Sequence, residues 1–164
     1  MMLKVNKFNL VKYLYFLIFF SLLLGFSSCS SSKNIRNLNV QQVIETAQSY
    51  RGTPYRYGGT TRSGIDCSAL VYHSFASVGV TLPRTSADQS KIGKRISRNH
   101  LREGDVIFFA TAKRGKKVTH AGIVTSTRGK GVSFIHASTS LGVTEDNINT
   151  DYWSKAYLFA RRVF

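Results

Sequence analysis

The period of the hydrophobic pattern changes near residue 104, and this change constrains the fold more than any other feature of the sequence. Before that point, residues 40–50 and 67–78 place apolar side chains three and four positions apart, which predicts amphipathic helices. After it, short apolar runs predict strands at 104–110, 118–125, 132–137 and 157–164. Helices followed by an antiparallel sheet indicate an α+β domain.

The first 28 residues have the pattern of a targeting segment. Three lysines and no acidic residue accompany an apolar run from Tyr13 to Phe26. That run is shorter than the ~20 residues of a membrane span and fits the core of a signal peptide. The sequence around Cys29, Phe-Ser-Ser-Cys, is similar to a bacterial lipoprotein signal. We therefore predict removal of residues 1–28 and lipid attachment, for example palmitate, at Cys29; an uncleaved anchor or an ordinary signal peptide is the alternative.

The sequence after residue 28 predicts a short tether followed by one domain. Residues 29–39 are polar and lack apolar periodicity, which predicts a lipidated tether, and residues 40–164 are enough for a single domain with a core. Without the three lysines of the targeting segment, 20 basic and 8 acidic residues give a net charge of +12. This charge favours anionic partners such as lipid head groups or a carboxylate-rich wall polymer. Export argues against nucleic acid, and we expect a monomer without a cofactor.

Cys67 is the candidate nucleophile. If Cys29 carries a lipid, Cys67 is the one free thiol of an exported chain, so disulfide pairing does not explain it. Asp66 is a suitable N-cap for the helix that begins at Cys67, and a helix N-terminus favours a thiolate through its free N–H groups and its dipole. The alternative is that Cys67 is simply a small core residue.

His120 and His136 lie on two successive predicted strands. A three-residue hairpin loop at 127–129, with Gly129 in a left-handed conformation, would place the two histidines opposite each other on one face, ~5 Å apart. A longer loop of the same parity would also keep them on one face. His120 would then be the base that activates the thiol, and His136 its orienting partner. Alternatively, both histidines are structural, or they form a zinc site with Cys67.

Five sequence blocks resemble, in order and spacing, those of the NlpC/P60 family of cell-wall cysteine peptidases. The resemblance covers residues 40–164. The blocks are Gly52-Thr-Pro-Tyr-Arg-Tyr-Gly-Gly59, Gly64-Ile-Asp-Cys-Ser68, Leu101-Arg-Glu-Gly-Asp-Val-Ile-Phe-Phe109, Thr119-His-Ala-Gly-Ile-Val124 and Ile135-His-Ala-Ser-Thr139. The resemblance implies a papain-like α+β fold, with N-terminal helices packed on a central antiparallel sheet. It also implies hydrolysis of peptide bonds in peptidoglycan stems or crosslinks.

The same resemblance implies a role for each matching residue. Cys67 would be the nucleophile, His120 the general base and then acid, and His136 the orienting residue. Tyr55 matches the tyrosine whose hydroxyl helps to hold the oxyanion. Asp66 and Ser68 flank the thiol and are candidates for binding the charged ends of the substrate, although Asp66 as a mere N-cap is an equal alternative.

One residue departs from the family pattern. Ala69 stands where many members have glycine. Because alanine is the better helix former, we expect no loss of function from it.

The bond that is cut has two candidates within this family. The small, single-domain lipoprotein organisation is similar to members that cut D,D crosslinks, which we favour over the γ-D-glutamyl–diaminopimelate bond. The same residues are also compatible with a non-catalytic wall-binding lipoprotein, or with an amidase or acyltransferase on the same fold. Ser30, which follows the predicted lipidated cysteine, does not resemble an inner-membrane retention signal. The outer membrane is therefore the expected location.

Overall fold

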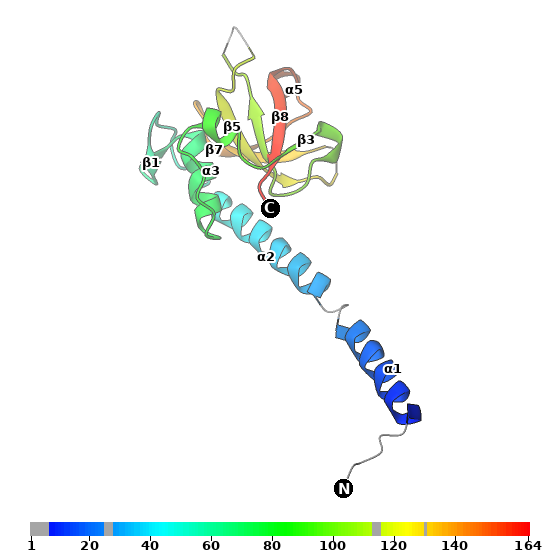
Figure 1. Cartoon of the computed structure of the whole chain (residues 1–164). Coiled ribbons are helices and arrows are strands. Elements are labelled where there is room, and N and C mark those ends of the chain that lie inside the picture. The colour runs from blue at the N-terminus through cyan, green and yellow to red at the C-terminus, as the bar shows by residue number, and fades with distance from the viewer. Residues whose placement is uncertain (1–6, 25–27, 113–115, 130) are drawn as a thin grey trace. The chain divides into compact units, whose positions relative to one another are not determined.

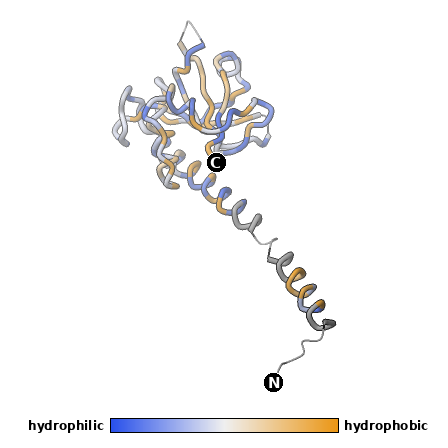
Figure 2. Tube along the Cα trace, in the orientation of Figure 1, coloured by the Kyte–Doolittle hydropathy of each residue, from blue (hydrophilic) through white to orange (hydrophobic). Residues whose placement is uncertain are grey.

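The structure is a computed structural model that describes residues 7–24, 28–112, 116–129 and 131–164. It divides into two compact units, Met1–Asn37 and Leu38–Phe164. The first unit contains helix α1 (Lys7–Leu24), which is strongly apolar (Figure 2), and the beginning of α2 (Ser28–Gln48). No helix in the described part of the chain is both long enough and apolar enough to cross a membrane. The predicted signal segment falls in part on residues 1–6 and 25–27, which lie outside the described residues.

Helix α2 begins earlier than the sequence pattern predicts. The pattern predicts a polar tether at 29–39 and a helix from residue 40, whereas the helix runs unbroken from Ser28. The reason is that residues 28–48 contain neither glycine nor proline, so nothing in the segment interrupts the helix. The absence of an apolar stripe before residue 40 predicts an unburied segment, but it does not decide whether that segment is helical.

The second unit contains a six-stranded antiparallel sheet with the strand order β3-β8-β4-β5-β6-β7 (Figure 1). The strands are β3 (Lys94–Ile96), β4 (Val106–Phe109), β5 (His120–Ser126), β6 (Ser133–Ser138), β7 (Gly142–Asn147) and β8 (Tyr157–Arg162). The helices after α2 are α3 (Cys67–Ala76), α4 (Ser86–Gln89) and α5 (Asp151–Ala156), with a 3-10 turn at Arg98–His100. A small hairpin of β1 (Thr60–Thr61) and β2 (Gly64–Ile65) precedes α3. This arrangement confirms the α+β fold and all four predicted strands.

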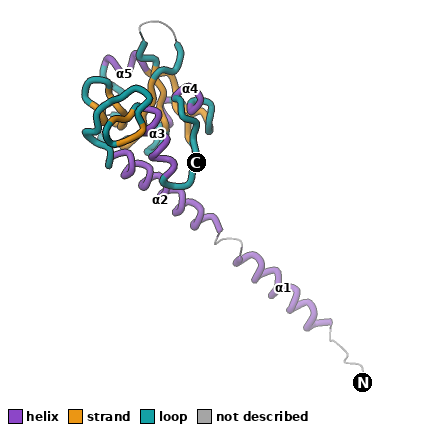
Figure 3. The backbone as a smooth tube through the Cα atoms, turned by 90° about the vertical axis from the view of Figure 1, so that its left-hand side faces the viewer, coloured by secondary structure: helices purple, strands orange, loops and turns teal. Residues whose placement is uncertain are grey.

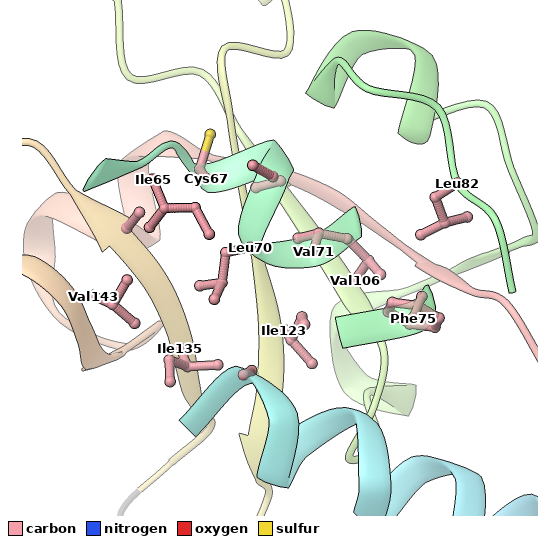
Figure 4. Close-up of a cluster of buried hydrophobic side chains, with 14 of the residues drawn as sticks. Ile65, Cys67, Leu70, Val71, Phe75, Leu82, Val106, Ile123, Ile135 and Val143 are labelled. Carbon is pink, nitrogen blue, oxygen red and sulfur yellow. The ribbon is translucent and has the colours of Figure 1, made fainter. Parts of the chain in front are cut away.

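The sheet packs against α2 and α3 on one face and against the short helix α5 on the other, and the course of these helices can be followed in Figure 3. On one face, residues of α2 and α3 such as Val43, Leu70 and Phe75 pack with Ile123 and Ile135 of the sheet (Figure 4). On the other face, α5 packs against side chains that alternate with the first set along the same strands. These strand residues include Ile107, Phe109, Val124 and Phe134, and Trp153 of α5 packs with them. Strands that are buried on both faces explain why β4 is apolar at every position.

The β5–β6 hairpin has the predicted parity but not the predicted register. Ile123 pairs with Ile135 and Val124 pairs with Phe134, whereas a loop confined to 127–129 would have paired Val124 with Val132. The hairpin is shifted by two residues and contains an irregularity between Val124 and Ser126. His120 and His136 therefore share a face, as predicted, but they are diagonal neighbours rather than directly opposed. Gly129 adopts the predicted left-handed conformation, with a φ of 78°.

Strand β7 and helix α5 have no counterpart in the sequence prediction. The sequence of β7, Gly-Val-Thr-Glu-Asp-Asn, has few of the apolar or aromatic residues that predict a strand. It becomes a strand because it pairs with β6 over its whole length, from Gly142 to Asn147. Tertiary pairing thus overrides a weak local preference.

Candidate active site

Cys67 is the first residue of α3, and the local sequence explains its position. Asp66 caps the helix: it has an extended backbone, and its side chain accepts a hydrogen bond from the Ala69 N–H. This confirms the predicted N-cap. The thiol is buried, with 7% of the residue exposed, at the edge of the helix-covered core, where its sulfur points away from Leu70 (Figure 4).

The backbone N–H groups of Ala121, Ser68 and Cys67 lower the pKa of the Cys67 thiol, but burial raises that pKa by more. Burial raises the pKa of Cys67 to about 11. Hydrogen bonds from the backbone of Ala121, Ser68 and Cys67 itself act in the opposite direction, and the negative charge of Asp66 adds to the increase. The predicted effect of the helix terminus, which lowers the pKa, is a real contribution, yet desolvation outweighs it. The contact with Ala121 also locates the sulfur beside the start of β5, one residue from His120.

His120 and His136 form a buried pair. Nε2 of His120 lies 2.9 Å from Nδ1 of His136, with the two rings nearly perpendicular. Burial, and then the neighbouring His136, lower the pKa of His120 to about 3. His120 is thus a neutral imidazole at neutral pH, and its hydrogen bond to His136 fixes the orientation of its ring. The structure therefore brings together the two histidines that strand parity predicts to share a face.

Two further residues complete this group, and neither is predicted from the sequence. Asp146 of β7 lies with Oδ2 3.0 Å from Nε2 of His136, and the Trp153 indole N–H donates to the same oxygen at 2.9 Å. The Trp153 ring also stacks on His120, with 5.6 Å between ring centroids. Burial lowers the pKa of His136, while the hydrogen bond and the charge of Asp146 oppose that decrease. No sequence signal points to Asp146, because its strand is not predicted.

Asp66 and Ser68 lie in a polar cluster beside the thiol, together with Arg84, which no sequence motif singles out. Arg84 donates to both carboxylate oxygens of Asp66, at 2.9 and 2.8 Å, and to the Ser68 hydroxyl. The Ser68 hydroxyl donates to Oδ1 of Asp66, and the Gly58 N–H donates to Oδ2 of Asp66. Burial alone would raise the pKa of Asp66, yet the hydrogen bonds from Arg84, Ala69 and Ser68 hold it below its ordinary value. The carboxylate is therefore charged and saturated with donors.

Tyr55 lies on the loop that precedes β1 and forms a bridge with Ile65, two residues before Cys67. Burial raises the pKa of its hydroxyl, and the charges of Cys67 and Asp66 contribute to the same shift. The bridge to Ile65 places the Tyr55 backbone near the start of α3. The upward shift of its pKa from 10.0 keeps the Tyr55 hydroxyl protonated at neutral pH, so it is available as a hydrogen-bond donor.

The zinc site that the sequence leaves open has no suitable ligand set here. Among the described residues, no three His, Cys, Asp or Glu side chains are grouped to hold one metal ion. The facing nitrogens of His120 and His136 are directed at each other, and the outer nitrogen of His136 is directed at Asp146. This arrangement suits proton transfer and orientation of an imidazole.

Comparisons with known proteins identify the family of the chain. The sequence pattern of the NlpC/P60 family matches residues 52–162. The chain is 39% identical to the "Murein DD-endopeptidase MepS/Murein LD-carboxypeptidase" of Escherichia coli over 131 residues, which cover 79% of this chain and 66% of the relative. It is 42% identical over 117 residues to the "Probable endopeptidase NlpC" of the same organism, covering 71% and 73% of the two chains.

A solved structure gives the same result for the fold. An NlpC/P60 family protein from Bacillus cereus superimposes with a TM-score of 0.68 at 34% sequence identity, covering 76% of this chain and 40% of that one. The matched region therefore spans just under two thirds of the E. coli murein endopeptidase and less than half of the B. cereus protein.

Proposed function

The chain belongs to the NlpC/P60 family, and we propose that it is a thiol endopeptidase that hydrolyses peptide bonds in peptidoglycan. The observation that carries the proposal is a buried thiol at the N-terminus of α3 beside the Ala121 N–H, where the preceding residue, His120, belongs to a hydrogen-bonded histidine pair. This set matches what acyl transfer requires: a nucleophile, a base and an orienting partner for the base.

The first step makes the nucleophile. His120 takes the proton of Cys67, and the resulting thiolate attacks the carbonyl carbon of the scissile peptide bond to form a carbon–sulfur bond. Burial disfavours either charge alone, but transfer of one proton creates both charges together, so each stabilises the other across a short distance. His136 supports the imidazolium of His120 through their hydrogen bond.

The second step releases the products. The Cys67 N–H and the Tyr55 hydroxyl hold the negative oxygen of the tetrahedral intermediate. The carbon–nitrogen bond breaks as His120 donates its proton to the leaving amine. His120 then takes a proton from water, whose oxygen attacks the thioester carbon. The carbon–sulfur bond breaks to release the acid product, and His120 returns the proton to the sulfur, which restores the neutral thiol and imidazole.

For the bond, we favour the D,D crosslink. The printed name of the E. coli relative, a murein DD-endopeptidase, supports this choice, as does the small size of the domain. The cationic Arg84, held between Asp66 and Ser68, is suited to an anionic group of the stem peptide. We therefore propose that the Asp66–Ser68–Arg84 cluster binds the substrate through Arg84, because the Asp66 carboxylate is already saturated with donors from the protein.

For the location, we propose a lipid anchor at Cys29 that holds the protein in the bacterial cell envelope, on the outer membrane. The lysine-flanked apolar segment and the small residues before Cys29 support this proposal. Cys29 lies in α2, and its side chain is outside the described part of the structure.

The test is digestion of purified peptidoglycan sacculi, with the released muropeptides identified by mass spectrometry. Cys67→Ala should abolish release, and Tyr55→Phe should reduce the rate by about 10²–10³, the usual effect of losing one oxyanion donor. Tyr57→Phe is the matched control. Tyr57 is 91% exposed, so this variant should be fully active. Unimpaired digestion by Cys67→Ala would refute the proposal. Cleavage within stems rather than at crosslinks would refute only the choice of bond.

A further inference from the structure

The histidine pair continues into a carboxylate, which fixes where the protons of the pair must lie. Asp146 Oδ2 is 3.0 Å from His136 Nε2, and His136 Nδ1 is 2.9 Å from His120 Nε2. His136 is almost completely buried, with 1% exposed, so water cannot easily substitute for either partner. Three side chains from three adjacent strands, β5, β6 and β7, therefore form one continuous chain of hydrogen bonds.

The donors and acceptors in this chain leave a single consistent assignment. An ionised carboxylate only accepts hydrogen bonds, so His136 must carry its proton on Nε2. A neutral His136 then has an unprotonated Nδ1, which accepts from His120, and His120 must carry its own proton on Nε2. This leaves Nδ1 of His120 as the basic nitrogen of the pair.

Trp153 holds the carboxylate in the orientation that this assignment requires. Its indole N–H, which can only donate, shares Oδ2 of Asp146 with His136 at 2.9 Å. The Trp153 ring also stacks on His120 and meets His136 edge-on, with centroids 4.8 Å apart. One indole thus contacts all three members of the chain.

We propose that Asp146 is a positioning residue that sets the tautomers of both histidines and so makes Nδ1 of His120 the base for Cys67. The catalytic part of this inference rests on the proposed thiol mechanism, whereas the tautomer assignment does not. Asp146 also places a negative charge at the end of the chain, where it stabilises the imidazolium that forms when His120 takes the thiol proton.

The first test measures tautomers directly, by ¹⁵N NMR of the full chain labelled at histidine, at neutral pH. We expect both His120 and His136 to be protonated at Nε2 in the unmodified protein. Asp146→Ala should give a mixture of tautomers at His136. Asp146→Asn should keep the original pattern, because Trp153 still demands an acceptor and keeps the amide oxygen facing His136. A proton on Nδ1 of His120 in the unmodified protein would overturn the inference.

The second test measures sacculus digestion by the same variants. Asp146→Ala should lower kcat by about 10- to 100-fold, by analogy with the loss of carboxylates that orient metal-bound histidines, and Asp146→Asn should have an intermediate kcat. The matched control is Glu145→Gln, which removes the same charge one residue away. Glu145 contacts Gln48 and Arg51, away from the histidines, so this variant should be fully active.

The outcomes separate this inference from the proposed function. Suppose that Cys67→Ala is inactive, but Asp146→Ala is as active as Glu145→Gln and keeps the histidine tautomers of the unmodified chain. In that case only the role proposed for Asp146 is wrong. If Cys67→Ala remains active, the thiol mechanism is wrong, and the NMR result still decides the tautomer assignment. Loss of activity and mixed tautomers in Asp146→Ala, with Asp146→Asn partly active, would support the positioning role.

Discussion

Cys67 and His120 are both buried, and burial moves their pKa values apart. It raises the pKa of the thiol to about 11 and is the main cause that lowers the pKa of the imidazole to about 3. At neutral pH the resting site therefore contains a neutral thiol and a neutral imidazole pair. The helix terminus and the Ala121 N–H, which favour a thiolate, offset only part of the desolvation cost. In the proposed mechanism, charge appears at this site only when one proton moves from sulfur to nitrogen.

These pKa shifts predict that the domain loses stability on both sides of neutral pH. Below the ordinary histidine pKa of 6.5, the unfolded chain binds a proton that folded His120 rejects until about pH 3. The free energy of unfolding should then fall on acidification by up to about 1.4 kcal/mol per pH unit from this residue. Above the ordinary cysteine pKa of 9.0, the unfolded chain releases a proton that folded Cys67 keeps until about pH 11. Stability should fall there as well.

Urea denaturation followed by circular dichroism between pH 5 and pH 10 would measure both effects. Cys67→Ala serves as the control on the alkaline side, since it removes the thiol and should reduce the loss of stability above pH 9. A free energy of unfolding that stays constant from pH 6.5 down to pH 5 would contradict the pKa assigned to His120.

The β5–β6 hairpin shows which features of an element can be predicted from sequence and which cannot. Side chains alternate along a strand, so the parity of the loop decides whether two histidines share a face. Several registers share the same parity, and the irregularity between Val124 and Ser126 decides which of them forms. No residue type in the loop predicts this irregularity. The contact between His120 and His136 was therefore predictable, but their diagonal placement was not.

Gly122 is essential to this element, because a side chain there would occupy the place of its neighbours on β6. A Cβ at Gly122 would lie 2.7 Å from the Phe134 ring, 2.9 Å from the Ile135 carbonyl oxygen and 3.3 Å from the His136 Cβ. Gly122→Ala should destabilise the domain by about 1–3 kcal/mol, the usual cost of overpacking, and should also reduce the activity of the folded fraction.

The control is Gly79→Ala, in the turn that follows α3. A Cβ there meets nothing within 4 Å, but the backbone is left-handed, with a φ of 77°. The Gly79→Ala substitution should lower the melting temperature without changing the specific activity of the folded enzyme. A fully active and equally stable Gly122→Ala would mean that β6 can move away from β5, against the packing described above.

In the molecule as a whole, a hydrophobic core lies on each face of the sheet. The candidate site contains residues from the helices on both faces and from the strands between them. Cys67 belongs to the layer of α2 and α3, whereas Trp153 comes from α5 and packs with Phe109 and Phe134 of the opposite core. The site thus depends on residues that are far apart in the sequence and on both faces of the sheet.

The anchor proposal makes a prediction about the intact protein. Expressed in a bacterium that processes lipoproteins, the chain should lose residues 1–28 and gain the mass of a diacylglycerol and an acyl chain at Cys29. Intact-mass spectrometry of the membrane fraction would measure this, with Cys29→Ala as the control that should remain unlipidated. An unmodified Cys29 in the mature protein would refute the anchor, and its failure would leave the enzymatic proposal unchanged.

The sequence by itself determined the α+β class, the helix that begins at Cys67, the four long apolar strands and the shared face of the two histidines. Each of these follows from local chemistry: an N-cap, a hydrophobic period or strand alternation. Only the tertiary structure decided that β7 is a strand and that Asp146, Trp153 and Arg84 lie beside the predicted residues. The physical reason is that these polar residues are held by hydrogen bonds to distant partners. Such bonds leave no periodic pattern in the sequence.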